Sequence, residues 1–222
     1  MKYFKCAFTL AEVLITLGVI GVVAAITLPT VIKNYQKHQT VTQLKYAYNL
    51  VNNALENFYS ENGMQREWDW VSEDNLENYI QDRIGKYIKV VKYYGKSHDN
   101  SPLCPEAKTF KKNNSAYRWL DNKTGISSPP FGNNTVSLLT VNNICIGLNN
   151  YGNQARIFID INNSTNKPNI SGKDLFIFRI DANGKIIPGF SIHDDCKKNS
   201  EGYNCSTKII RNNWKIDKDY PW

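Results

Sequence analysis

Hydrophobic residues form one uninterrupted run near the N-terminus and are spaced periodically along the rest of the chain. From Phe8 to Leu28 the sequence reads FTLAEVLITLGVIGVVAAITL, in which Glu12 is the single charged residue. At a rise of about 1.5 Å per residue this run makes a helix of roughly 32 Å, close to the ~30 Å thickness of the hydrocarbon core of a bilayer. The pattern therefore predicts one membrane-spanning helix.

Residues 29–62 are predicted to continue this helix in amphipathic form. Pro29 removes one backbone hydrogen bond, and so it favours a kink or local melting at that point. Beyond it, apolar residues recur at intervals of three and four: Val41, Leu44, Tyr48, Val51, Leu55 and Phe58. We expect this face to pack against a globular domain, and we expect Asn62 and Gly63 to end the helix.

The polar remainder, residues 63–222, is predicted to be a globular head. It begins with a second helix, for which Ser72, Glu73 and Asp74 provide a start. The apolar residues of this helix stand at helical spacing: Leu76, Tyr79, Ile80 and Ile84. The segment Asp99–Pro130 is rich in Pro, Asn, Lys and Ser, and it is predicted to be a loop region.

Short runs of β-branched and aromatic residues, separated by Asn and Gly, indicate antiparallel strands joined by hairpins. These runs are Val136–Thr140, Ile144–Leu148, Ala155–Ile161 and Leu175–Ile180. A turn at Asp181–Gly184 then leads to a short apolar stretch, Lys185, Ile186 and Ile187. The predicted fold class is α+β, with a long N-terminal transmembrane and amphipathic helix packed on a small antiparallel β-sheet head.

Composition and charge narrow the possible functions. The chain has 222 residues, of which 41% are hydrophobic and 21% charged, and this fits one globular domain with an appendage. The formal charge of +7 comes from scattered lysines, so we do not expect a nucleic-acid partner. His38, His98 and His193 lie far apart and are predicted to be surface residues. The sequence contains no P-loop, G-x-S-x-G or dinucleotide fingerprint, and it predicts no enzymatic activity.

The first 29 residues, MKYFKCAFTLAEVLITLGVIGVVAAITLP, resemble the N-terminal cleavage and methylation motif of type IV prepilins and type II secretion pseudopilins. Besides the basic leader and the apolar run, the matching positions are Phe8, Thr9, Leu10, Glu12 and Pro29. The resemblance implies a leader of residues 1–7, cleavage between Ala7 and Phe8, N-methylation of Phe8, and Glu12 as the fifth mature residue. The family normally has Gly before the cut, where this chain has Ala7.

The resemblance also implies a function, partners and a location. The chain would be a structural subunit of a type IV pilus or of a type II secretion or competence pseudopilus. Its partners would be copies of itself, sister pilins, the prepilin peptidase and an inner-membrane assembly platform. Residues 8–28 would cross the bacterial inner membrane once, with the leader in the cytoplasm, before the subunit joins an extracytoplasmic filament.

Cleavage would change the charges at the start of the helix. It would create a positive α-amino group on Phe8, and Glu12 of a neighbouring subunit could pair with that group in the low dielectric of a filament core. The loss of Lys2 and Lys5 would also lower the formal charge from +7 to +5. Because these lysines hold the leader in the cytoplasm, extraction of the helix into a filament would become easier.

Two other interpretations of the N-terminal run are open. A secretory signal peptide has an apolar core of about 7–15 residues that ends at a small-residue cleavage site, whereas Ala24 and Ala25 are followed here by more apolar residues. A simple anchor has no need for Glu12, since a carboxylate inside the bilayer is costly. The alternative functions are a membrane-anchored exported binding module, or a minor pilin with an adhesive or DNA-binding head.

The five cysteines fall into two groups. Cys6 lies in the leader, and the other four lie in the predicted exported head without the C-x-x-C spacing of a zinc or redox centre. Thiols on the far side of a membrane form disulfides. We expect the pairs Cys196–Cys205 and Cys104–Cys145.

Asp160, Asn162 and Asp174 surround a polar turn and offer the carboxylate and amide oxygens that bind calcium. An EF-hand counted from Asp160 fails, because Thr165 and Ser171 stand where Gly and Glu are required. The segment also loosely resembles the calcium-binding loop of major pseudopilins. Calcium is therefore the one predicted cofactor, and the alternative is a hydrogen-bonded β-loop without a metal.

Overall fold

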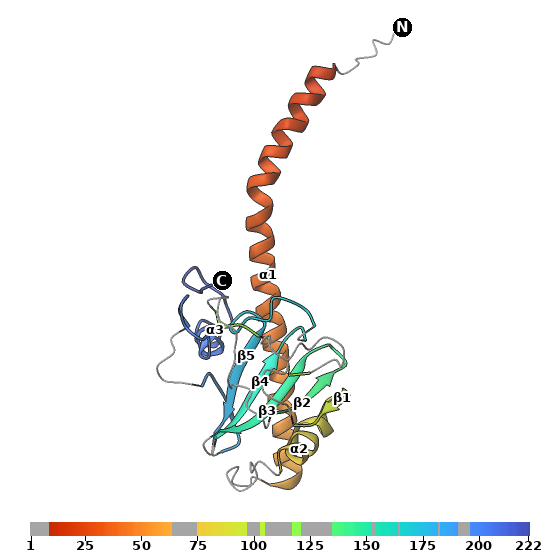
Figure 1. Ribbon diagram of the computed structural model, residues 1–222, viewed down its shortest axis with the longest axis vertical. Helices are drawn as coiled ribbons and strands as arrows, with labels where there is room; N and C mark the ends of the chain where they lie inside the picture. Colours follow the sequence, from red (N-terminus) through yellow and green to blue (C-terminus); the bar gives the residue numbers. More distant parts are fainter. Residues whose placement is uncertain are drawn as a thin grey trace. The chain divides into compact units, whose positions relative to one another are not determined.

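We describe a computed structural model of the chain in which a long helix is followed by an antiparallel sheet (Figure 1). The structure describes residues 9–63, 75–96, 103–104, 117–120, 135–151, 154–163, 165–181, 183–190 and 196–222. Contacts within the chain divide it into two compact units, Met1–Gln39 and Thr40–Trp222. Helix α1 (Leu10–Asn62) contributes its first part to one unit and its second part to the other.

The second part of α1 buries one face in the head, as its apolar spacing predicts. The buried residues on this face are Thr40, Leu44, Ala47, Val51, Ala54 and Leu55. Most of them recur at intervals of three or four residues and belong to the core of the head. The helix ends at Asn62, because Gly63 adopts a φ of 75° and donates its N–H to the carbonyl of Tyr59 at 2.9 Å. The predicted end of the helix is therefore confirmed.

A short helical segment follows in three forms. It consists of α2 (Leu76–Tyr79), the π-helical turn η2 (Ile80–Ile84) and the 3₁₀ turn η3 (Gly85–Tyr87). The four apolar residues that predict this helix, Leu76, Tyr79, Ile80 and Ile84, are all buried. The predicted start at residues 72–74 lies outside the described residues.

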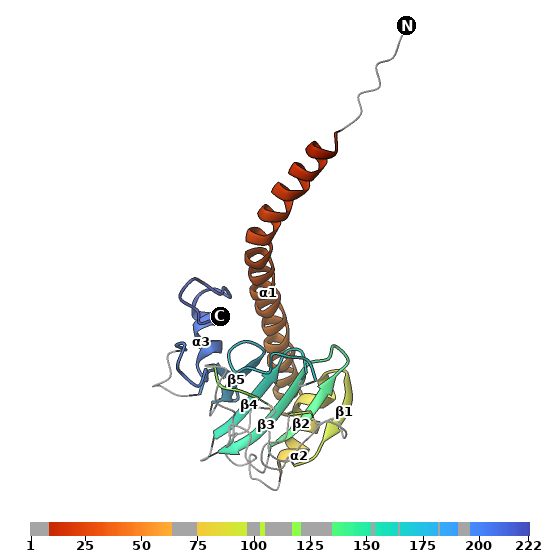
Figure 2. The same cartoon turned by 45° about the horizontal axis from the view of Figure 1, so that its top comes forward.

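Six antiparallel strands form a meander in the order β1-β2-β3-β4-β5-β6 (Figures 1 and 2). The strands are β1 (Val90–Tyr94), β2 (Val136–Thr140), β3 (Cys145–Tyr151), β4 (Gln154–Asp160), β5 (Leu175–Ile180) and β6 (Ile186–Pro188). Both figures show the end of α1 behind the sheet, with α3 (Cys205–Arg211) beside β5 and α2 at the side of β1 and β2. The fold class is the predicted α+β class.

The sheet is covered on both faces, and the central strands are apolar on both faces for that reason. Along β4, Ile157 and Ile159 point into the core shared with α1, and Phe158 points into a second core on the opposite face. The second core contains Leu103, Cys104, Tyr117, Cys145, Leu175 and Ile177. Each face of the sheet therefore has its own packed layer.

Two elements of the structure are not predicted from the sequence, and two predicted strands begin and end at other residues in the structure. Strand β1 is an edge strand with mostly exposed residues, so it lacks the apolar alternation that marks a half-buried strand. Helix α3 has only seven residues and no long apolar stripe. Strands β2 and β5 have the predicted bounds, whereas β3 and β4 are displaced by one to three residues at their ends. Most of the predicted loop 99–130 lies outside the described residues.

The predicted turn before β6 is present. The backbone N–H of Gly184 donates to the carbonyl of Asp181 at 3.0 Å, and the carboxylate of Asp181 accepts the N–H groups of Asn183 and Lys185. Gly184 has a φ of 72°, which a residue with a side chain would adopt only under strain. This turn sets the pairing of β6 with β5.

Candidate assembly site

The first part of α1 is an apolar helix surface that is open to its surroundings. Residues 10–28 include no buried side chain, and Glu12 is the one charged residue among them. Large apolar side chains are exposed along the whole stretch, from Leu10 at 76% to Ile32 at 52% and Tyr35 at 66%. By length and composition this helix can cross a membrane. The helix is continuous through Pro29, and a kink there stays a prediction.

Glu12 caps the start of this helix together with Thr9. The backbone N–H and the hydroxyl of Thr9 both donate to Oε2 of Glu12, each at 2.8 Å. In return, the Thr9 hydroxyl oxygen accepts the backbone N–H of Glu12 at 3.3 Å. This reciprocal arrangement is a capping box, which satisfies backbone donors that a helix start otherwise leaves unpaired.

The capping box gives Glu12 a structural role in addition to the predicted pairing with an amine. The sequence signal for this role is the T-x-x-E spacing of Thr9 and Glu12. Because Phe8 is bonded directly to Thr9, cleavage after Ala7 would leave the box intact and place the new α-amino group one residue from it. Ala7 and Phe8 themselves lie outside the described residues.

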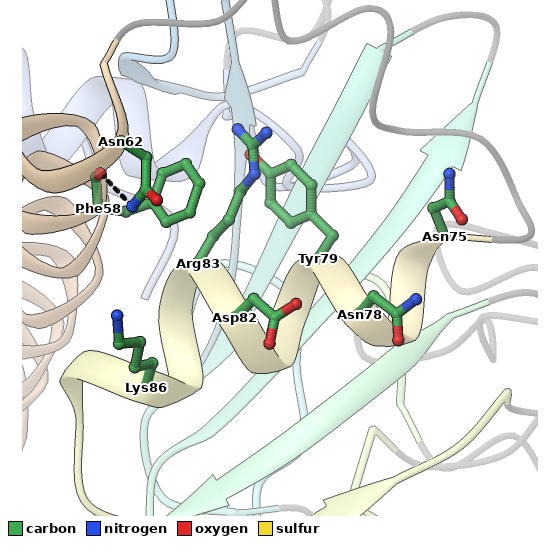
Figure 3. Close-up of a pocket in the computed structure, with 8 residues that line it drawn as sticks. All are labelled: Phe58, Asn62, Asn75, Asn78, Tyr79, Asp82, Arg83 and Lys86. Atoms are coloured by element: carbon green, nitrogen blue, oxygen red, sulfur yellow. Dashed lines mark hydrogen bonds between the residues drawn. The ribbon is translucent and has the colours of Figure 1, made fainter.

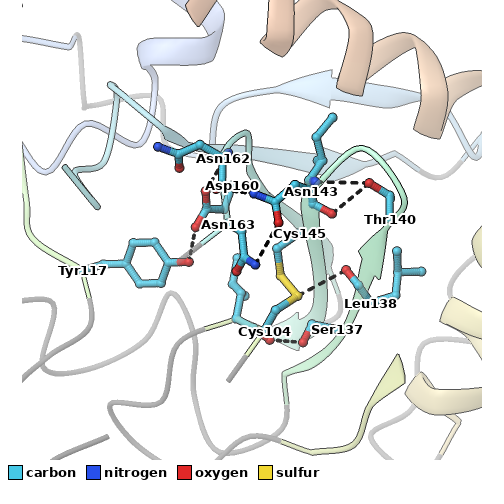
Figure 4. Close-up of a disulfide and its surroundings, with 12 residues drawn as sticks. Cys104, Tyr117, Ser137, Leu138, Thr140, Asn143, Cys145, Asp160, Asn162 and Asn163 are labelled. Atoms are coloured by element: carbon cyan, nitrogen blue, oxygen red, sulfur yellow. Dashed lines mark hydrogen bonds between the residues drawn. A yellow bond between two sulfur atoms is a disulfide. The ribbon is translucent and has the colours of Figure 1, made fainter. Parts of the chain in front are cut away.

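Both expected cysteine pairs are bonded in the head. Cys104 and Cys145 have Cα atoms 6.0 Å apart and join a loop segment to β3 across 41 residues of sequence (Figure 4). Cys196 and Cys205 have Cα atoms 4.9 Å apart and join the start of α3 to the segment before it across 9 residues. All four cysteines are fully buried. Sγ of Cys104 lies 3.3 Å from the carbonyl oxygen of Leu138, a contact without a hydrogen bond because a disulfide sulfur has no proton.

Asp160 and Asp174 lie buried at the second face of the sheet, with protein donors on every carboxylate oxygen. Asp160 accepts the hydroxyl of Tyr117 at 2.5 Å on Oδ2 and the backbone N–H of Asn162 at 3.1 Å on Oδ1 (Figure 4). The carboxylate of Asp174 accepts the backbone N–H groups of Asn169 at 2.5 Å and Ile170 at 2.6 Å. These contacts fix the loop between β4 and β5.

The same contacts bear on the predicted calcium site. Calcium takes six to eight oxygen ligands, whereas donor hydrogens already point at all four carboxylate oxygens of Asp160 and Asp174. Asn162 donates its side-chain amide to the carbonyl of Lys167 at 3.3 Å, although its buried Oδ1 has no hydrogen-bond partner. Among the described residues, no group of three His, Cys, Asp or Glu side chains could hold a metal. The geometry favours the hydrogen-bonded loop, and calcium binding stays a prediction.

Calcium binding can be measured through stability. A cation that binds the folded head must raise its melting temperature, because a ligand of the native state stabilises that state. Addition of millimolar calcium after chelation should therefore raise the melting temperature if Asp160, Asn162 and Asp174 bind the ion. An unchanged melting temperature would leave the hydrogen-bonded loop as the correct interpretation.

Burial of the two carboxyl groups makes stability depend on pH. Burial, together with the charge of Asp174, raises the pKa of Asp160 to about 7, and burial raises the pKa of Asp174 to about 6. Both folded-state pKa values exceed the ordinary 3.8, so the folded chain binds more protons than the unfolded chain between about pH 4 and pH 7. The free energy of unfolding should fall across this range as pH rises, by up to about 1.4 kcal/mol per pH unit for each extra proton.

This prediction can be checked with Asp160→Asn. The amide cannot ionise, and the hydroxyl of Tyr117 can turn to accept from it, so the variant should lose much of the decline in stability between pH 4 and pH 7. The measurement is urea unfolding at a series of pH values. Equal slopes for the variant and the parent chain would show that the carboxyl group of Asp160 does not titrate in this range.

Of the histidines and the leader cysteine, only His38 lies within the described residues, and it contributes to no site there. His38 is exposed on α1, whereas His98 and His193 lie outside the described residues, as does Cys6. One buried residue that is not predicted from the sequence is Arg83, a charged side chain that is only 2% exposed. Its signal is the apolar stripe of the second helix, because Arg83 follows Leu76 by seven positions and so lies on the same face.

Comparisons with known proteins give partial similarities. No protein-family model and no solved structure matches the chain. Fimbrial protein EcpC of Eikenella corrodens is 30% identical over 94 residues, which are 41% of this chain and 56% of that protein. A cGMP-specific 3',5'-cyclic phosphodiesterase gamma of Plasmodium yoelii is 29% identical over 89 residues, 40% of this chain and 10% of that protein. The chain thus spans about half of the fimbrial protein and a tenth of the phosphodiesterase.

The similarity to a fimbrial protein and the long apolar N-terminal helix together are consistent with a pilin-like protein. They support a structural role. They are also consistent with a protein that is anchored in a membrane and displayed at a surface. The two disulfides of the head fit such a location.

Proposed function

We propose that the chain is a prepilin-type subunit that is cut between Ala7 and Phe8, methylated on Phe8 and assembled through α1 into a pilus or pseudopilus filament. The observation that carries this proposal is the exposed apolar part of α1, which begins at the capped Glu12. An apolar surface of this extent is unstable in water and needs lipid or other apolar helices around it. The similarity to a fimbrial protein favours a filament in which the helices of other subunits surround this apolar surface.

In this proposal each segment has one task. Residues 1–7 are the leader, residues 8–28 hold the precursor in the bacterial inner membrane, and residues 29–62 carry the head, residues 63–222, outside it. The prepilin peptidase removes the leader, and an assembly platform transfers the subunit from the membrane to copies of itself or to sister pilins. The role of residues 29–62 in carrying the head is supported by the amphipathic packing of α1 in the head.

Glu12 would set the register of the filament. The new amine of Phe8 carries a positive charge, and a neighbouring subunit that is displaced along the filament axis could place its own Glu12 against that amine. An ion pair of this kind stabilises mainly because each partner saves the other from burial alone. Glu12 is exposed in the single chain and is therefore accessible to another subunit.

Processing can be tested by intact-mass analysis of the protein from the membrane fraction. The proposal expects the loss of Met1–Ala7 and one added methyl group on Phe8. A mature chain that starts after Ala25 would instead identify an ordinary signal peptide. A full-length chain with Met1 retained would identify a simple anchor, as expected for a membrane-anchored exported binding module.

A further inference from the structure

The two edges of the sheet differ in how they are covered. Strand β6 forms one edge, and there the hydroxyl of Thr207 on α3 donates to the carbonyl of Pro188 at 2.9 Å. Strand β1 forms the other edge and pairs with β2 alone among the described strands (Figures 1 and 2). On β1 the side chains of Val91 and Tyr93 are 62% and 40% exposed. An edge strand directs alternate backbone N–H and C=O groups away from its sheet, so β1 offers these groups to a further strand.

A β-bulge in β1 places two lysines on the same face of the sheet. Between Val90 and Lys92 the register shifts, because β1 has one residue more than β2 in this interval. Pairing continues beyond the bulge, where the carbonyl of Lys89 accepts the N–H of Val141 at 3.1 Å. Side chains alternate between faces along a strand, and the extra residue brings Lys89 to the face of Lys92 although the two are three positions apart. Tyr94 shares this face, with its ring centre 4.9 Å from Nζ of Lys92.

The charges of these two lysines are not balanced within the described part of the chain. Neither Lys89 nor Lys92 forms an ion pair there, and both side chains are exposed. The carboxylate of Asp82, shown in Figure 3, and that of Glu77 also lie near β1, but both residues belong to the helical segment α2–η2. That segment packs on the opposite face of the sheet, on the side of Tyr93. The face of Lys89 and Lys92 is therefore positively charged and exposed.

This arrangement disfavours a second copy of the chain as the partner of β1. Antiparallel pairing of two β1 strands would put the lysines of both copies on one face of the joined sheet, where like charges repel. A strand with carboxylates opposite Lys89 and Lys92 would instead form cross-strand pairs of opposite charge. The residues between those carboxylates would lie on the face of Val90 and Tyr93, where apolar side chains fit.

We propose that β1 binds an extended segment of a partner protein in which acidic and apolar residues alternate. The segment adds to the sheet as a further strand, with its backbone paired to the outward N–H and C=O groups of β1. Its carboxylates lie beside Lys89 and Lys92, and its apolar side chains contact Tyr93. The proposal concerns the head alone, and it does not depend on cleavage or filament assembly.

The test uses the full chain in micelles of a nonionic detergent and a blocked peptide of about nine residues in which Glu alternates with Val. Isothermal titration calorimetry at about 50 mM salt should give a dissociation constant below about 1 mM for this peptide and no binding of a peptide in which Lys alternates with Val. No binding of the Glu/Val peptide would overturn the proposal and leave the lysines as protection of the edge against pairing.

Strand addition is distinguished from general attraction of anions by two further peptides. Each is the Glu/Val peptide with N-methyl groups on every second amide, and the two differ in which set of amides is methylated. One edge of an added strand donates to β1 and the other faces solvent, so one methylated peptide should bind at least about tenfold more weakly than the other. Equal binding of both, or equally tight binding of a single-stranded oligothymidylate, would identify a general polyanion surface and contradict the proposal.

Variants locate the binding at β1. Lys89→Glu/Lys92→Glu should weaken binding of the Glu/Val peptide at least about tenfold and should bind the Lys/Val peptide instead, because the cross-strand charges are reversed. Lys198→Glu/Lys218→Glu makes the same change in net charge at exposed lysines elsewhere in the head and should keep the preference for Glu/Val. The opposite result in either variant would contradict the proposal. The two methylated peptides are compared on the parent chain, so that comparison stands even if a variant fails to fold.

Discussion

Cells in which Glu12→Ala is the only copy of the protein should insert and cleave the subunit normally but assemble few filaments. Removal of a carboxylate makes the helix more apolar, so membrane insertion should not suffer. The residues on both sides of the cut are unchanged, so cleavage should proceed. Assembly would bury the Phe8 amine without its partner, which is strongly destabilising, and sheared filament should fall by more than about tenfold.

The capping box makes a second explanation of such a defect possible, and matched variants separate the two. Glu12→Gln keeps a side chain that can cap the helix but removes the charge, because glutamine also serves at this position of a capping box. Thr9→Ala keeps the charge and removes the hydroxyl of the box. If the amine pair drives assembly, Glu12→Gln should fail like Glu12→Ala, and Thr9→Ala should assemble.

The reverse result would change the role of Glu12. Filaments from Glu12→Gln together with a defect in Thr9→Ala would show that Glu12 acts by capping the helix. Normal filaments from all three variants would show that neither the charge of Glu12 nor the capping box is needed for assembly. Thr9→Ser is the control, since it keeps the hydroxyl and should match the parent chain. Insertion and cleavage are followed by membrane fractionation and intact mass in every strain.

The second large effect is expected from the disulfide between Cys104 and Cys145. Its removal in the double variant Cys104→Ala/Cys145→Ala should lower the free energy of unfolding by about 4 kcal/mol. The reason is that a link across 41 residues restricts the unfolded chain strongly. Urea unfolding of the full chain, followed by tryptophan fluorescence, provides the measurement.

The second disulfide supplies the matched control. The link between Cys196 and Cys205 spans only 9 residues, so Cys196→Ala/Cys205→Ala should cost about 2.6 kcal/mol by the same chain-entropy argument. Both pairs are fully buried, so the loss of packing is similar in the two variants. A larger cost for the shorter link would contradict the argument from loop length. Non-reducing peptide mapping of the parent chain should show both pairs, and free thiols at these four positions would contradict them.

The fold leaves the two parts of α1 with different surroundings. The side chains of residues 9–39 are almost all exposed, whereas α1 residues from Thr40 onward contribute to the core of the head. The continuous apolar run ends at Leu28, and the apolar stripe begins at Val41, just after the boundary between the two units. The first part of α1 thus leaves its apolar side chains exposed, and the second part buries its apolar side chains in the head.

Local patterns in the sequence were sufficient for much of the fold. The apolar run and the three-and-four spacing after it predicted a long helix that ends at Asn62, since helix periodicity and a C-terminal glycine need no distant contact. The bounds of β2 and β5 followed from β-branched and aromatic runs, because both strands are central and apolar. Edge strand β1 had no such pattern and was missed.

Tertiary structure alone decided the chemistry of the head. The sequence placed Asp160 and Asp174 near a turn, but only the packing of Tyr117 and the loop backbone against them determined that donors surround both carboxylates. Arg83 stacks on an aromatic ring because Phe58, 25 positions earlier, is brought beside it by the end of α1 (Figure 3). Periodicity fixes which face of an element is buried, whereas burial of a charge and its partners depend on contacts between residues far apart in sequence, which no local pattern contains.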